Sequence, residues 1–242
     1  MPFTLPEPLS SLHAEIIACH QCPRLVAWRQ EVASTKRRAY QEWDYWGRPV
    51  PGFGDPDARL LLVGLAPGAH GANRTGRAFT GDGSGNFLYA ALYRTGFANQ
   101  PTSEHRDDGL RLLDCFITMP LRCVPPQNRP VADELNACRP YMAQEIALLP
   151  RIQVLLCLGG VAFEQTLRTL RGMGMEIPRM KFSHGAQYEI EGSAGDADPL
   201  AGRWKRLSVL CCYHPSLQNT NTGRLTPDMM DRVLNEARLL LT

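Results

Sequence analysis

The side chains in this sequence that could do chemistry gather in three polar segments. These segments are residues 64–85, residues 122–130 and residues 214–226. The first contributes a carboxylate at Asp82 and, at Phe79, an aromatic face on which a planar ring could stack. The second contributes the amide of Asn128 and the third the imidazole of His214. Each has a structural alternative, because Phe79 could be a core aromatic, asparagine is common in turns and a lone histidine is usually structural.

Eight cysteines form the second group of reactive side chains. Cys19 and Cys22 form a C-x-x-C pair, while Cys123 and Cys138 are separated by a proline-rich loop and the start of a predicted helix, so four thiolates could meet. A tetrahedral zinc site and a [4Fe–4S] cluster both accept four cysteines, and spacing does not choose between them. A redox pair is disfavoured because the C-x-x-C lies between helices. The other cysteines lie in apolar strand patterns, as small buried hydrophobes: Cys115, Cys157, Cys211 and Cys212.

Cations and aromatic side chains alternate in residues 35–51. Lys36, Arg37, Arg38 and Arg48 are interleaved there with two tyrosines and two tryptophans. Such a mixture suits a surface that faces nucleic acid. The alternative is a solvated loop whose aromatic side chains pack on the core, and the sequence leaves both open.

Short apolar strands alternate with amphipathic helices around these segments. The strands are expected at residues 59–65, 115–119, 154–158 and 207–213, and the helices at residues 9–17, 23–32, 87–95, 132–149, 161–170 and 227–241. Runs buried on both faces are typical of parallel strands. This order predicts a mainly parallel sheet with helices on both faces. Because each polar segment directly follows a strand, all three should meet at the carboxyl edge of the sheet.

Composition sets broad limits on the whole chain. The 242 residues with 44% hydrophobic content predict one domain over residues 1–242. A formal net charge of +2 is too small to indicate a polyanionic partner, so any affinity for nucleic acid must come from a local basic patch. The start resembles no secretory signal, and the longest apolar runs fall short of the roughly 18 residues of a membrane helix. A cytoplasmic protein without membrane contact is expected. Residues 192–204 suggest a hairpin or mobile insertion, without an assigned function.

Together the three segments resemble the motifs of family 5 uracil-DNA glycosylases. They read GLAPGAHGANRTGRAFTGDGSG at residues 64–85, RCVPPQNRP at residues 122–130 and HPSLQNTNTGRLT at residues 214–226. The likeness extends to residues 19–28 and 49–55. It implies a three-layer α/β/α sandwich with a mainly parallel four-stranded sheet, and a [4Fe–4S] cluster on Cys19, Cys22, Cys123 and Cys138. It also implies a monofunctional glycosylase that hydrolyses the N-glycosidic bond of uracil, and of other deaminated or damaged bases, in DNA.

The resemblance also implies roles for individual residues. Asp82, His214 and Asn128 would be catalytic: Asp82 orients water, His214 donates to the departing base and Asn128 recognises its edge. Members of the superfamily usually carry an Asp or Asn in the first loop. The absence of such a residue here is typical of family 5. The substrate pocket would be completed by Gly68, Ala69, His70 and Phe79. Leu217 and Gln218 would enter the base stack when the nucleotide flips out, and phosphate contacts would come from Arg74, Arg77, Arg129 and Arg224.

Two other functions use some of the same residues. A noncatalytic iron–sulfur or zinc module could bind nucleic acid through residues 35–51, but it leaves Asp82 and His214 without a purpose. A small-molecule hydrolase could use the same two residues on a nucleoside. The glycosylase is expected to act as a monomer on double-stranded DNA, associated with the nucleoid.

Overall fold

The computed structural model of the protein describes residues 5–191 and 206–242. The segment predicted as an insertion, residues 192–204, lies outside the described residues. Four parallel strands form the centre of one sheet. In spatial order they are β3 (Cys115–Thr118), β2 (Leu60–Val63), β4 (Val154–Leu158) and β6 (Arg206–Cys212). All four predicted strands are therefore confirmed.

Two short antiparallel strands enlarge the sheet to six strands, where four were predicted. They are β1 (Phe53–Gly54), which pairs with β3, and β5 (Gln187–Glu191), which pairs with β6. The sequence showed neither, because β1 is two residues long and Ile190 is the one fully buried residue of β5. Edge strands bury little, so they lack the apolar run that identifies a central strand.

Successive side chains of the central strands enter two different cores. Leu60 and Leu62 of β2 join the core on one face of the sheet, whereas Leu61 and Val63 join the core on the other. All four side chains are fully buried. The period of two and the burial on both faces explain why these strands are continuously apolar.

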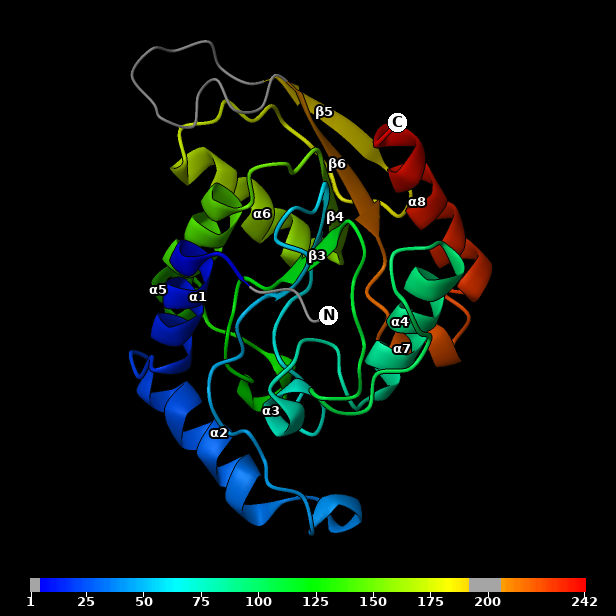
Figure 1. Cartoon of the computed structure of the whole chain (residues 1–242). Helices are drawn as coiled ribbons and strands as arrows, with labels where there is room; N and C mark the ends of the chain where they lie inside the picture. The colour runs from blue at the N-terminus through cyan, green and yellow to red at the C-terminus, as the bar shows by residue number, and fades with distance from the viewer. Residues whose placement is uncertain (1–4, 192–205) are drawn as a thin grey trace.

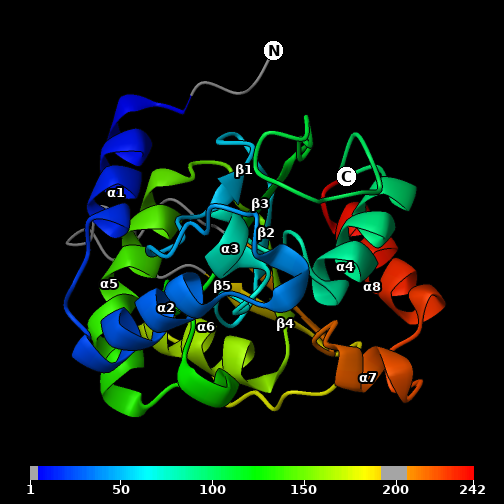
Figure 2. The ribbon, with the colours of Figure 1, turned by 90° about the horizontal axis from the view of Figure 1, so that it is seen from below.

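Helices cover both faces of the sheet and complete three layers (Figure 1). The helices are α1 (Glu7–Ile17), α2 (Pro23–Thr35), α3 (Ala72–Thr75), α4 (Gly83–Arg94), α5 (Ala132–Leu148), α6 (Gly160–Gly172), α7 (Leu217–Asn221) and α8 (Pro227–Leu240). α4 and α8 pack together on one face, and α1, α5 and α6 cover the other, as the end view also shows (Figure 2). The six predicted helices are confirmed. α3 and α7 were expected as loop because so short a helix shows no periodicity.

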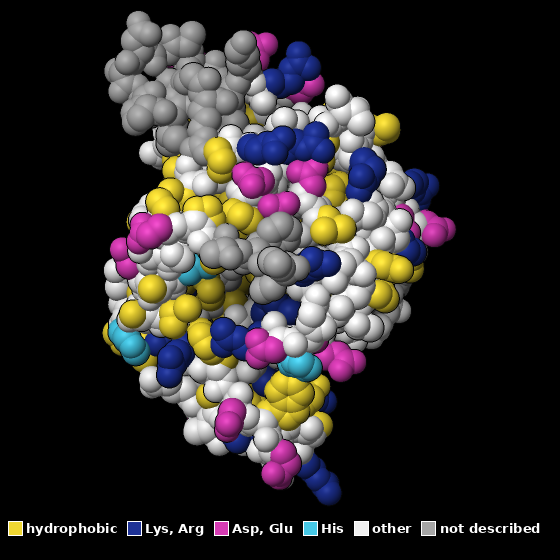
Figure 3. Space-filling model, viewed as in Figure 1, with side chains coloured by type: hydrophobic (Ala, Val, Ile, Leu, Met, Phe, Trp, Pro, Cys, Tyr) yellow, Lys and Arg dark blue, Asp and Glu magenta, His cyan; other side chains and the backbone are white. Residues whose placement is uncertain are grey.

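The surface carries charges of both signs. In the face seen in Figure 3, Lys and Arg side chains lie interspersed with Asp and Glu. This mixture agrees with the formal net charge of +2. None of the helices in residues 5–191 and 206–242 has the length and hydropathy needed to cross a bilayer.

Candidate active site

The three polar segments meet in one cleft of about 610 Å³ at the carboxyl edge of the sheet. They follow β2, β3 and β6, which is why the parallel topology brings them together. The predicted site residues that line the cleft are Gly68, Ala69, His70, Phe79, Asp82, Asn128, His214, Leu217 and Gln218. The four predicted phosphate-binding arginines are not among the lining residues.

Asp82 begins α4 and faces the cleft. Its Oδ1 accepts a hydrogen bond of 2.9 Å from the backbone N–H of Gly85, which makes it the N-cap of the helix. Its Oδ2 lies so close to Gly71 that a Cβ there would collide with it, and a Cβ at Gly68 would lie 2.8 Å away. These two glycines are needed to accommodate the carboxylate, a purpose that the sequence had not indicated. Burial raises the pKa of Asp82, and nearby backbone N–H groups and Arg74 partly offset the rise.

Phe79 lines the cleft, and its ring packs against that of His214 in a tilted arrangement. The two ring centroids lie 5.8 Å apart at an interplanar angle of 34°. Phe79 has a φ of 51°, which is a true outlier for a bulky side chain and costs on the order of 1–3 kcal/mol. Gly64 leaves room for its ring, since a Cβ there would lie 2.7 Å from Phe79 Cε2. The surrounding fold therefore holds Phe79 in an unfavourable backbone conformation at the cleft wall.

His214 is a neutral imidazole at physiological pH. Burial lowers the pKa of His214 to about 4, because the cationic form would lose hydration that no nearby carboxylate replaces. A neutral ring keeps one N–H donor and remains uncharged beside Phe79. The backbone that follows is fixed, since Asn219 Nδ2 donates to the carbonyl oxygen of His214 at 2.8 Å.

The buried imidazole makes folding stability depend on pH in a defined window. The folded pKa of His214 is about 4, and the unfolded value is about 6.5. Below pH 6.5 the unfolded chain binds a proton that the folded chain refuses, so stability falls as pH falls toward 4, by up to about 3 kcal/mol. His214→Gln should flatten this slope, and chemical unfolding at pH 7 and pH 4.5 measures it. An identical slope in the variant would contradict the neutral, buried state.

His70 and Asn128 also line the cleft. His70 Nδ1 lies 3.0 Å from Tyr45 Oη, so the tyrosine fixes the ring from outside the pocket. Burial lowers the pKa of His70, and Arg37 and Arg74 lower it further. Asn128 is exposed and left-handed, with a φ of 56°. Its loop is tied to α2, because Arg24 donates to the carbonyl oxygen of the next residue at 3.0 Å.

The four predicted phosphate contacts divide into two pairs. Arg129 and Arg224 are exposed, and the Arg224 guanidinium lies 4.6 Å from the ring centre of Tyr213. Arg74 and Arg77 are only 3% and 4% exposed. Because these two side chains are enclosed by protein, their prediction as phosphate contacts is corrected: the structure makes them internal.

Arg77 is held by an internal ion pair. Its guanidinium binds Asp108 through two hydrogen bonds of 2.8 and 2.9 Å, and it also donates to Thr80 Oγ1 and Ser103 Oγ. Asp108 is some thirty residues away along the chain, so no local pattern indicated that this cation would be buried. A fully bonded guanidinium has no donor left for a phosphate.

Leu217 and Gln218 project from the first turn of α7 at the rim of the cleft. Leu217 lines the cleft and is 56% exposed. Its side chain packs over Gly83, where a Cβ would lie 2.6 Å from Leu217 Cδ2. Ser216 caps the helix by accepting from the N–H of Asn219. The rim therefore presents an apolar side chain on a short capped helix.

Residues 35–51 contain both packed aromatic side chains and exposed cations. Tyr40 and Trp43 pack against the Arg74 guanidinium at 3.9 and 4.0 Å. These two aromatic side chains therefore pack against the protein, as the second interpretation expects. The side chains of Arg37, Arg38 and Arg48 remain exposed.

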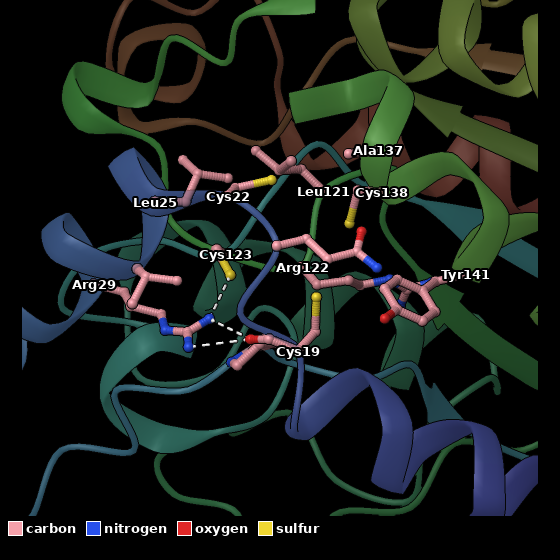
Figure 4. A pocket seen from close by; sticks show the side chains of 13 residues that line it. Cys19, Cys22, Leu25, Arg29, Leu121, Arg122, Cys123, Ala137, Cys138 and Tyr141 are labelled. Atoms are coloured by element: carbon pink, nitrogen blue, oxygen red, sulfur yellow. Dashed lines mark hydrogen bonds between the residues drawn. The ribbon is translucent and has the colours of Figure 1, made fainter. Parts of the chain in front are cut away.

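The four candidate ligand cysteines line one apolar cavity away from the cleft. Figure 4 shows the sulfur atoms of Cys19, Cys22, Cys123 and Cys138 around a common space. Leu25 and Leu121 close it, and burial raises the pKa of the Cys138 thiol to about 12. Among the described residues, no three His, Cys, Asp or Glu side chains are arranged to hold a single metal ion. The remaining four cysteines are fully buried in strands, as predicted.

A buried arginine tests whether this cavity suits an anionic group. Arg29 is 1% exposed, and its Nη1 donates to Cys123 Sγ at 3.0 Å. Its other partners are the Cys19 carbonyl oxygen and His20 Nδ1, and among the described residues no carboxylate pairs with it. A buried cation without a counterion is costly. Deprotonated thiolates around an iron–sulfur cluster would supply the missing negative charge, so the residues present fit such a group.

Several residues that line the cleft were not predicted as site residues. They are Leu65, Ala66, Gly71, Gly83, Ser84, Pro125 and Ser216. All lie within or next to the three polar segments, so adjacency was the one signal that could have identified them.

The sequence of this chain is similar to those of several known proteins. The sequence model of the Uracil DNA glycosylase superfamily matches residues 51–238. A type-5 uracil-DNA glycosylase of Mycobacterium tuberculosis is 48% identical over 233 residues, covering 96% of this chain and 81% of that protein. A type-5 uracil-DNA glycosylase of Thermus thermophilus is 48% identical over 225 residues, covering 93% and 94%. A type-4 uracil-DNA glycosylase of Archaeoglobus fulgidus is 28% identical over 212 residues, covering 87% and 82%.

Proposed function

The chain belongs to the uracil DNA glycosylase superfamily and to its type-5 group, and we propose that Asp82, Asn128 and His214 are the residues that release uracil from DNA. Its activity is that of a uracil-DNA glycosylase, a hydrolase of N-glycosidic bonds in base excision repair. One observation carries the assignment of the site: loops that follow three different strands place a carboxylate, an amide and an imidazole in one cleft.

The reaction needs a water molecule oriented at the sugar and a stabilised leaving base. The glycosidic bond breaks with its electron pair going to uracil, and water then adds to the sugar carbon, which has become cationic. Such a centre is very electrophilic, so the water needs orientation more than a strong base. The carboxylate of Asp82 lines the cleft and would supply this orientation, while its Oδ1 also caps the helix.

His214 and Asn128 would act on the base itself. The neutral imidazole of His214 would donate to the negative charge that develops on the departing uracil. Asn128 offers both donors and an acceptor, so its amide can match a uracil edge. The uracil ring would stack on Phe79 between them, with the backbone of Gly68 and Ala69 completing the pocket.

The DNA would reach this cleft with its damaged nucleotide flipped out, because a base inside a duplex is inaccessible. Leu217, exposed on the rim, would fill the gap left in the stack, with Gln218 beside it. Arg129 and Arg224 remain available for phosphates. We propose a monomer acting on double-stranded DNA, in the cytoplasm on the nucleoid, since one chain contributes the whole cleft.

We further propose a [4Fe–4S] cluster on Cys19, Cys22, Cys123 and Cys138. The four thiols around one apolar cavity and the uncompensated charge of Arg29 support it. The cluster would supply a rigid cross-link between α2, α5 and the loop that carries Asn128.

Cys123→Ser should therefore lower both cluster content and the order of the Asn128 loop. We expect less iron and sulfide per chain and a weaker brown absorbance, because serine is a poorer ligand for iron than a thiolate. Cys157→Ala is the matched control, since this cysteine lies in β4 and should keep full iron content. Normal iron and colour in Cys123→Ser would contradict the ligand assignment.

The activity itself is tested by release of free base from a labelled duplex with one uracil. Uracil should be released and an abasic site left, whereas the same duplex with thymine should remain intact. A duplex with hypoxanthine tests our proposal that the pocket of small residues accepts other deaminated bases. Free deoxyuridine separates this function from a nucleoside hydrolase: cleavage of the nucleoside as fast as the duplex would support the hydrolase.

A further inference from the structure

Arg74 joins the two ends of the loop that builds the cleft. Its Nε donates to the carbonyl oxygen of His70 and its Nη2 to that of Gly81, both at 2.7 Å. His70 lines the cleft, and Gly81 directly precedes Asp82. Gly81 has a φ of 81°, and a Cβ there would collide with the Arg74 guanidinium. One side chain thus fixes the distance between His70 and the start of the Asp82 turn.

The segment after α2 covers this guanidinium from outside. Arg74 Cζ lies 3.9 Å from the ring centre of Tyr40 and 4.0 Å from that of Trp43. The same segment is bonded to α3, because Trp46 N donates to the Arg74 carbonyl oxygen at 2.9 Å. Such cation–π contacts strengthen when the cation is desolvated, and Arg74 is 3% exposed.

We propose that Arg74 is a positioning residue, which clamps His70 to the Asp82 turn, and that Tyr40 and Trp43 hold this clamp closed. The inference rests on the proposed role of Asp82 and assigns a purpose to the aromatic residues of the 35–51 segment. It replaces the predicted phosphate contact of Arg74 with an effect on the reaction step.

The charge of Arg74 also acts on the carboxylate. Burial raises the pKa of Asp82, and the Arg74 cation opposes this rise. The other titratable side chains that line the cleft are His70 and His214, and burial lowers the pKa of both. Loss of Arg74 should therefore shift the acid limb of the rate profile to higher pH, because Asp82 would take up a proton more readily.

The test is the rate of uracil release under single-turnover conditions with saturating enzyme. Arg74→Met should slow this step by about 10- to 100-fold, because a reacting group displaced by about 1 Å can lose that much. The salt dependence of duplex affinity should stay that of the wild type. A wild-type rate at saturation together with a salt slope reduced by about 0.9 would overturn the proposal, since it is the signature of a lost phosphate contact.

Arg224→Met provides the comparison, because Arg224 is an exposed arginine of the third polar segment, residues 214–226. It should weaken duplex binding and reduce the salt slope by about 0.9, as expected for a lost phosphate contact. Arg74→Met is therefore expected to lower the saturated rate, and Arg224→Met to reduce the salt slope. The same pattern in both variants would overturn the clamp.

A second variant covers the case in which Arg74→Met does not fold, which thermal unfolding would reveal. Trp43→Leu keeps both Arg74 hydrogen bonds but removes one covering ring, so the saturated rate should fall roughly 2- to 10-fold with an unchanged salt slope. A wild-type rate in Trp43→Leu would refute the supporting role of the ring. Asp82→Asn tested alongside separates the two ideas: full activity there would refute the role of Asp82, while the rate of Arg74→Met still tests the clamp.

Discussion

Asp82→Asn is expected to slow uracil release by about 10²- to 10⁴-fold, the range typical for loss of a catalytic acid or base. Asparagine keeps the size of the side chain and an oxygen that can cap α4, so Gly85 N–H retains an acceptor. What disappears is the negative charge that we propose orients water in the cleft. Single-turnover base release from a uracil duplex at pH 7.5 measures the effect.

Asp82→Asn is more informative than Asp82→Ala because Asp82 has two roles. Alanine would also remove the helix cap, which costs about 1 kcal/mol and would mix a stability loss with the chemical one. Asp228→Asn is the control, since this exposed carboxylate lies in the first turn of α8, away from the cleft. Its rate should equal that of the wild type. If Asp82→Asn were equally active, the carboxylate would serve the helix alone.

Glu145→Ala is expected to lower the free energy of unfolding by about 3–5 kcal/mol, as when one partner of a buried ion pair is removed. Glu145 is completely buried, and Arg122 donates to its Oε2 at 2.6 Å. Thr118 Oγ1 and the backbone N–H of Gly52 also donate to this carboxylate. Arg122, and after it His13, lower the pKa of Glu145 to about 2, against the effect of its burial. Without it, the Arg122 cation would stay buried without a counterion.

Urea unfolding of Glu145→Ala and of Gln144→Ala makes the measurement selective. Gln144 is the exposed neighbour on α5, and its loss should change stability by less than about 0.5 kcal/mol. Adding Arg122→Met to Glu145→Ala should recover part of the loss, because the unpaired charge is then gone. A loss below about 1 kcal/mol in Glu145→Ala would show that this pair does not hold the loop after β3 to α5.

The sequence predicted those parts of the fold whose signals are local. The central strands were found because their side chains are buried on both faces, as Leu60–Val63 illustrates. β5 was missed because its composition is polar. It is a strand because of its surroundings in the fold. α7 is only five residues long, too short for a helical period to appear.

The cleft was predicted to a similar extent, and for similar reasons. Asp82, Asn128 and His214 follow strand ends, so topology alone brings them together. Arg74 and Arg77 were misjudged because their partners, Trp43 and Asp108, lie far away along the chain. Whether a cation faces solvent or protein is decided by such distant contacts, which spacing and composition do not record.

The four cysteines in the strands of the sheet share a low chemical reactivity. Cys115, Cys157, Cys211 and Cys212 have no exposed surface, and burial raises the pKa of each thiol. Alkylating reagents attack thiolates, so these four thiols remain unreactive while the sheet is intact. Their modification requires the sheet to open. The rate at which they are alkylated under native conditions therefore reports how often the protein unfolds globally.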